Sequence, residues 1–167
     1  MMRLVTFESG GSLFGIPASA VRSVLPGERP AGIPGMPAFL VGLITIRGDL
    51  VPVVDLQRLL DGQATEMSRD ACLVVADVQG TDVALLVPRL GPSLLLGSDR
   101  IDPSPVIGGA AAVPYVADVA RLSEGLCLVL DVSVLLAGHA GVISRCLAGA
   151  ERGEEGGDGE SACHAAA

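Results

Sequence analysis

The sequence predicts an all-β protein made of two small barrels that pack side by side. Short apolar runs alternate with turns rich in glycine and proline, which is typical of strands rather than of long helices. Half of the residues are hydrophobic, so there is ample material for a core. One arrangement, a strand followed by an aspartate, a short helix and a glycine, occurs twice along the chain. Together these observations favour small barrels over a helical or βαβ fold.

Two hairpins are predicted from apolar runs that flank glycine-containing turns. Residues 4–7 and 13–16 are separated by a polar segment with the pair Gly10-Gly11. The same layout returns at residues 72–75 and 83–87, around a turn that contains Gly80. Such pairs of runs indicate antiparallel strands joined by a tight turn.

A further hairpin is predicted around the triplet Arg47-Gly48-Asp49. An apolar run, residues 39–46, leads into this turn, and a β-branched run, residues 50–54, leaves it. Arg47 therefore lies at the end of a strand. Its guanidinium group is either a surface solubiliser or an anchor that presents several hydrogen-bond donors to a partner.

A short helix is predicted directly after this hairpin. Asp55 can accept backbone N–H groups as the N-cap of a helix over residues 56–60, and Gly62 stands where a left-handed C-terminal cap is needed. The capping and turn roles of Asp49 and Asp55 explain both carboxylates without a reaction.

The end of the first half is echoed at the end of the second. Residues 126–138 repeat the order of residues 52–62, with strand, aspartate, short helix and glycine. This echo predicts two similar β-rich units over residues 3–62 and 70–138, connected by the polar link 63–69. The alternative is a chance echo in a chain rich in valine and leucine.

Two segments are expected to lack regular structure. Residues 108–114 are small and turn-rich, which indicates a mobile loop. We expect one folded domain over residues 1–150 and a disordered acidic tail over residues 151–167, where five acidic residues accompany one arginine. A docking role for this tail is the alternative to a solvated one.

The charge and aromatic content argue against a nucleic-acid partner. The net charge is −8, the chain has eleven arginines and no lysine, and tryptophan is absent. Phosphate binding needs clustered positive charge, and single strands usually stack on aromatic side chains. A protein or a small molecule is the better expectation for a partner.

No membrane insertion and a cytoplasmic location are expected, because the apolar runs are too short to span a bilayer and no signal-peptide pattern is present. The four cysteines, Cys72, Cys127, Cys146 and Cys163, have no C-x-x-C spacing. Buried thiols are the main expectation for them, and a disulfide or a metal site is the alternative.

The sequence predicts no enzyme, catalytic residue, cofactor or metal. The histidines, His139 and His164, lie after the second short helix and in the tail, away from any strand that could place them beside a nucleophile. No Gly-rich loop with a following lysine is present to bind phosphates.

The motifs of the first half resemble those of one family. The pattern I-P-x-x-P-x-F-x-x-G-x-x-x-x-R-G is present over residues 33–48, and P-x-x-D-L follows over residues 52–56. Residues 14–17, Phe-Gly-Ile-Pro, precede both. In this order and spacing they resemble the CheW-like family, the coupling proteins of bacterial chemotaxis arrays. The resemblance covers about residues 3–138 and is weaker after residue 70.

The resemblance implies a fold of two five-stranded, SH3-like barrels around a shared apolar core, with short capping helices. It also implies a non-enzymatic scaffold, or adaptor, in a two-component signal-transduction system. Such a protein bridges the cytoplasmic tips of methyl-accepting chemoreceptors to the regulatory domain of a CheA-type histidine kinase, itself CheW-like. It would be cytoplasmic, recruited to membrane-associated receptor arrays, where other CheW-like proteins are further partners in the array rings.

The resemblance also implies which residues bind partners. Arg47 matches the functional arginine of the family, and Val21 and Gly42 fall at positions associated with partner contact. Together with Ile46, Val21 and Gly42 would form an apolar edge or groove that buries part of a partner. Ser23 stands where many members carry a glutamate, so an acidic partner for Arg47 is missing locally.

A second departure leaves two further interpretations open. Pro88 stands where the family commonly shows an aspartate, and proline is expected to end the preceding strand. A CheW-like adaptor of an alternative chemosensory pathway, such as surface motility, could have kinase coupling weakened by Ser23 and Pro88. A small-molecule-binding β-barrel domain is an alternative of another class.

Overall fold

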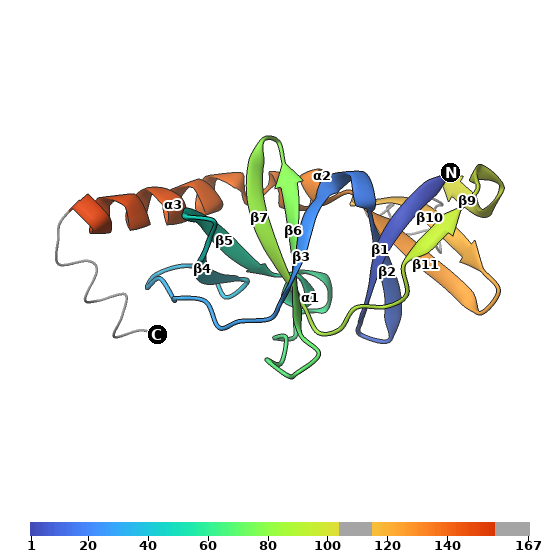
Figure 1. The fold of residues 1–167 in the computed structure, drawn as a ribbon, viewed down its shortest axis with the longest axis horizontal. Coiled ribbons are helices and arrows are strands. Elements are labelled where there is room, and N and C mark those ends of the chain that lie inside the picture. Colours follow the sequence, from blue (N-terminus) through green and yellow to red (C-terminus); the bar gives the residue numbers. More distant parts are fainter. Residues whose placement is uncertain (104–114, 156–167) are drawn as a thin grey trace.

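The computed structural model describes residues 1–103 and 115–155, with side chains as far as Gly149. The protein is mostly β, with two mixed sheets, one of them curled into a half-barrel, and a few helices (Figure 1). The mobile loop predicted for residues 108–114 lies outside the described residues.

The first sheet has six strands in the order β8-β1-β2-β11-β10-β9. Among the described residues its one parallel pair is β2 with β11, in which Phe14 is opposite Leu128. The bounds are β1 Met2–Ser9, β2 Ser12–Pro17, β8 Leu94–Leu96, β9 Ile101–Pro103, β10 Val116–Leu122 and β11 Gly125–Leu130.

The second sheet has five strands in the order β3-β6-β7-β5-β4. Here the parallel pair is β5 with β7, in which Val54 is opposite Leu85. The bounds are β3 Val21–Pro26, β4 Leu40–Ile46, β5 Asp49–Asp55, β6 Cys72–Val78 and β7 Thr81–Val87.

The sheets divide the chain differently from the two consecutive units expected from the echo. The N-terminal hairpin β1-β2 joins the last strands of the chain, and the short 3-10 helix Ala18–Ala20 leads from it into the other sheet. The sheets therefore have six and five strands, with open strand orders, where two five-stranded barrels were expected. The physical reason is the long-range parallel pairing of β2 with β11, which no local pattern encodes.

The predicted hairpins are confirmed, and they share one turn geometry. Two-residue turns connect β1 to β2, β4 to β5 and β6 to β7. Both turn residues have positive φ in each case, as type I′ turns require. In the β4-β5 turn the values are 52° for Arg47 and 84° for Gly48. Arg47 is thus one of two non-glycine residues with positive φ among the described residues, the other being Gln79.

The two predicted Asp-capped helices are also confirmed. Helix α1, Leu56–Asp61, is capped by Asp55, and Gly62 adopts the left-handed conformation at φ 83°. Helix α2, Val132–Ala137, is capped by Asp131 through the N–H of Val134 at 3.1 Å. Gly138 does not adopt the left-handed conformation, because the chain turns directly into a further helix two residues later.

Asp55 does more than cap α1. Its carboxylate, 1% exposed, accepts hydrogen bonds from the N–H of Arg58 (3.2 Å), the N–H of Thr65 (2.8 Å) and the hydroxyl of Thr65 (2.6 Å). The last two bonds fasten the polar link 63–69 to the end of β5. The contact with Thr65 was not predicted from the sequence.

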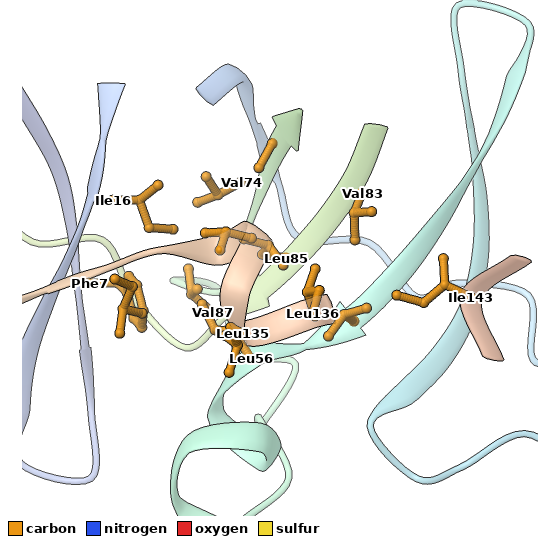
Figure 2. Close-up of a cluster of buried hydrophobic side chains, with 14 of the residues drawn as sticks. Phe7, Ile16, Leu56, Val74, Val83, Leu85, Val87, Leu135, Leu136 and Ile143 are labelled. Atoms are coloured by element: carbon orange, nitrogen blue, oxygen red, sulfur yellow. The ribbon is translucent and has the colours of Figure 1, made fainter. Parts of the chain in front are cut away.

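One apolar core joins the two sheets. Phe7 and Ile16 of the six-stranded sheet belong to the same buried cluster as Val74 and Leu85 of the five-stranded sheet, and Leu136 of α2 completes it (Figure 2). The shared core implied by the resemblance is therefore present. Separate clusters lie around Val53 and Leu73 in the five-stranded sheet and around Leu4 and Val129 in the six-stranded sheet.

Helix α3, Ala140–Glu155, was not predicted from the sequence. Ile143 and Cys146 are buried in the shared core, and Val142 and Leu147 pack against it. Residues 151–155, the first part of the tail expected to be disordered, continue this helix beyond its anchored part. The remainder of the tail, residues 156–167, lies outside the described residues.

The described cysteines are free thiols, and burial is confirmed for two of the three. Cys127 and Cys146 are buried and Cys72 is half-buried. Burial raises the pKa of the Cys127 thiol to about 11 from its ordinary value of 9.0, and burial also raises the pKa of Cys146. Cys163 lies outside the described residues.

Replacing Asp55 by alanine should lower the free energy of unfolding by about 2–4 kcal/mol, because a helix cap is lost and the buried donors of Thr65 are left unpaired. Urea denaturation measures the change. Asp131→Ala is the matched control, because Asp131 caps α2 through a single hydrogen bond, and it should cost about 1 kcal/mol. Equal costs for the two variants would show that the bonds to Thr65 add nothing.

The free energy of unfolding should also fall as pH rises from about 9 to about 11, because the unfolded thiol of Cys127 ionises at lower pH than the folded one. Denaturation at a series of pH values measures the slope. The variant Cys127→Ala should show a smaller fall over the same range. An unchanged slope in this variant would contradict the assignment to Cys127.

Candidate protein-binding surface

The five candidate residues lie on one sheet but at its two opposite edges. Val21 and Ser23 belong to β3, and Gly42 and Ile46 belong to β4. Strands β6, β7 and β5 lie between these two edges. Arg47 follows β4 in the turn to β5. The structure therefore groups the candidates into a β3 edge and a β4 edge.

Arg47 is exposed and unengaged. Its side chain forms no hydrogen bond or ion pair with any residue that the structure describes. The positive φ of Arg47 is a property of the tight turn and does not depend on the guanidinium group. The side chain is thus available to a partner, and the described residues supply no acidic partner for it.

Gly42 has a structural role that the sequence did not reveal. It is buried at a β-bulge with φ 149°, and a Cβ built there would stand 2.1 Å from the carbonyl oxygen of Ala31. Ala31 approaches this closely because it exchanges backbone hydrogen bonds of 2.9 and 3.0 Å with Leu43. Because Gly42 has no side chain, the segment before β4 can cover part of the outer edge of β4. Without this cover, the backbone groups along that edge would be unpaired.

The β3 edge carries a pair of ion contacts that the sequence analysis missed. Arg22 is within 3.0 Å of Asp77 and 2.5 Å of Asp82, on the two neighbouring hairpin strands. Val24, on the same strand, is 40% exposed. Exposed ion pairs of this kind contribute little to stability, so their clearer effect is to hold the orientation of Arg22. The edge presents a half-buried Val21 and Ser23 beside an exposed apolar residue.

Strand β7 ends at Val87, immediately before Pro88, as the sequence predicted. The Pro88 ring lines a surface hollow together with Gly10 and Gly11 of the first hairpin turn. The end of β7 therefore lies beside the six-stranded sheet.

The described part of the chain offers little to catalysis. It holds no group of three His, Cys, Asp or Glu side chains placed to bind a metal ion. His139 lies with its ring centroid 4.5 Å from that of Phe39, so it contributes to packing. None of the helices within the described ranges has both the length and the apolar content that crossing a bilayer requires.

Comparison with known proteins identifies a family that this sequence resembles. A family model described as "CheW-like domain" matches residues 3–139. "Chemotaxis protein CheW" of Treponema pallidum is 24% identical over 137 residues, covering 80% of this chain and 81% of that protein. "Chemotaxis protein CheW" of Rhizobium meliloti is 30% identical over 128 residues, covering 75% and 82%. "Protein FrzA" of Myxococcus xanthus is 31% identical over 121 residues, covering 70% and 72%.

A solved structure shares the fold. The crystal structure of the scaffolding protein TtCheW from Thermoanaerobacter tengcongensis matches with a TM-score of 0.73 and 21% identity. The match covers 81% of this chain and 92% of that one. The arrangement of two mixed sheets is therefore a fold already known for a scaffolding protein.

Replacing Gly42 by alanine should lower the free energy of unfolding by about 2–4 kcal/mol, because the new methyl group and the Ala31 carbonyl cannot both keep their places. Thermal and urea denaturation measure the loss. Gly48→Ala is the control, since a Cβ there meets open space and only its positive φ is disfavoured. If Gly42→Ala cost no more than Gly48→Ala, the close approach would not constrain the fold.

Proposed function

The chain belongs to the CheW-like domain family, a family of non-enzymatic chemotaxis scaffold proteins, and from this premise we propose that it couples chemoreceptors to a CheA-type histidine kinase. Its partners would be the cytoplasmic tip of a methyl-accepting receptor and the regulatory domain of the kinase. It would act in the cytoplasm at membrane-associated receptor arrays, beside other CheW-like proteins. Each sheet would serve as one SH3-like unit of the family fold.

The observation that carries the proposal is the exposed, unengaged Arg47 at the end of the family motif. A guanidinium group offers several donors in a fixed fork, which suits a carboxylate or backbone carbonyl of a partner. Half-buried Ile46 precedes it on β4 and supplies apolar surface next to the charge. A contact of this kind contributes about 1–3 kcal/mol to binding.

The β3 edge supplies a second contact surface. An outer strand can accept a strand of a partner, and exposed Val24 beside Val21 gives such a contact apolar area. The two edges lie on opposite sides of one sheet, so two partners can bind it together. Because both sheets share one packed core, a small shift imposed by one partner is transmitted to the rest of the molecule.

Ser23 and Pro88 bear on how strongly the kinase is coupled. Ser23 leaves the β3 edge without the carboxylate that many members have at this position, and Pro88 removes a backbone donor at the end of β7. An adaptor of an alternative chemosensory pathway, with weaker kinase coupling, is the second form of the proposal. Binding to the receptor with little binding to the kinase would select it.

Replacing Arg47 by alanine should leave the free energy of unfolding within about 0.5 kcal/mol of wild type, because the side chain has no described partner. Binding should weaken at least about fivefold, which corresponds to about 1 kcal/mol. Isothermal titration of the purified chain against the kinase regulatory domain and a receptor cytoplasmic fragment from the same organism measures it.

Arg3→Ala is the matched control, since Arg3 is exposed on β1 of the other sheet and likewise has no described ion pair. It should bind as wild type does. An unfolded Arg47→Ala variant would show a structural role instead, and unchanged binding by a folded one would remove Arg47 from the interface. If the wild-type chain binds neither partner, the proposed function is contradicted and a small-molecule-binding domain becomes the better hypothesis.

A further inference from the structure

A second positively charged site lies away from Arg47. A surface pocket of about 310 Å³ is lined by Arg29 and Pro30 of the segment after β3, Val41 of β4, Arg58 of α1, and Thr65 and Met67 of the polar link. Segments between residues 29 and 67 thus meet around it, together with Leu86 of β7. Neither Val41 nor the two arginines belongs to the candidate surface predicted from the family motifs.

The two guanidinium groups of this pocket are unengaged. Arg29 is exposed and Arg58 is half-buried, and neither side chain forms a hydrogen bond or ion pair with a described residue. Asp55 also borders the pocket, but its carboxylate is 1% exposed. Its oxygens already accept three hydrogen bonds from Thr65 and the backbone of Arg58. The donors of both arginines therefore remain open to an external acceptor.

The pocket is also partly apolar. Met67 is 38% exposed, and the apolar side chains of Val41 and Leu86 also line the pocket. Apolar walls exclude water and so strengthen a charge pair, and methionine adapts to apolar groups of different shape. A polyanion is disfavoured because the chain as a whole carries a charge of −8. The pocket thus suits a single carboxylate with an aliphatic neighbour.

We propose that this pocket binds an acidic side chain of a protein partner, with Arg29 and Arg58 holding the carboxylate and Met67 covering an adjacent aliphatic residue. The proposal deepens the proposed function, because Val41 of the pocket belongs to β4, the strand that also carries Ile46 of the candidate surface. It gives the partner a stated chemistry, a glutamate or aspartate next to a leucine, isoleucine or valine. Two guanidinium groups around one carboxylate are a strong form of charge-assisted hydrogen bonding.

The test that does not depend on the identity of the partner is a titration followed by ¹H–¹⁵N NMR. The probe is the peptide acetyl-Leu-Glu-Leu-amide, and its matched control is acetyl-Leu-Gln-Leu-amide. Amide shifts should be confined to residues around the pocket, and they should be at least about tenfold smaller with the glutamine peptide, since the carboxylate is what the arginines recognise. The variants Arg29→Gln and Arg29→Gln/Arg58→Gln should lose the response stepwise while keeping the wild-type spectrum elsewhere.

Three outcomes would overturn the proposal: no shifts at the pocket, equal shifts with both peptides, or an equally strong response to inorganic phosphate, which would indicate a plain anion site. In the titration against kinase and receptor fragments, Arg29→Glu/Arg58→Glu should weaken binding at least about tenfold relative to Arg3→Glu/Arg100→Glu, which changes the charge equally. If the wild-type chain binds neither fragment, the proposed function is wrong. The peptide titration still tests separately whether the pocket binds a carboxylate.

Discussion

The burial of apolar side chains between the two sheets is the constraint on which the rest of the structure depends. Strands from both ends of the chain must come together before this core can form, because β2 pairs with β11 while β3 to β7 form the other sheet. Helices α2 and α3 then cover the core with residues such as Leu136 and Ile143. The two sheets therefore form one cooperative unit rather than two independent barrels.

This packing limits where a partner can bind. Each sheet contributes to the shared core and also has a buried cluster of its own, so apolar packing occupies much of both sheet faces. What remains are edges, turns and the pockets between connecting segments. The β3 edge, the turn at Arg47 and the pocket of Arg29 and Arg58 are all features of this kind. An adaptor needs such separate surfaces, because it must hold more than one partner on one rigid body.

The features that the sequence predicted correctly are local. Glycines between apolar runs indicated the hairpin turns, where they adopt positive φ. Asp55 and Gly62 indicated a helix between them, because aspartate can cap its start and glycine can adopt the left-handed conformation at its end. Strand order could not be predicted, because the pairing of β2 with β11 joins residues more than a hundred positions apart. Helix α3 was missed because Gly141 and Gly149 lower its intrinsic propensity, and its apolar face, around Ile143 and Cys146, is short.

The candidate site was predictable only in part. Arg47 could be placed at the hairpin turn from the glycine that follows it, whereas the role of Gly42 became visible only with Ala31 beside it. The contact of Asp55 with Thr65 has no sequence signal beyond a threonine in a polar link. Likewise, Arg29 and Arg58 are ordinary surface arginines in the sequence, and only the fold brings them to one pocket.

The most direct test of the adaptor account is kinase autophosphorylation in reconstituted receptor membranes. Receptor membranes and the CheA-type kinase of the same organism are combined with and without the purified chain, and phosphate incorporation is followed with and without attractant. The account predicts that the chain is needed for receptors to raise kinase activity and for attractant to lower it. Kinase activity that responds to receptors and attractant equally well without the chain would contradict it.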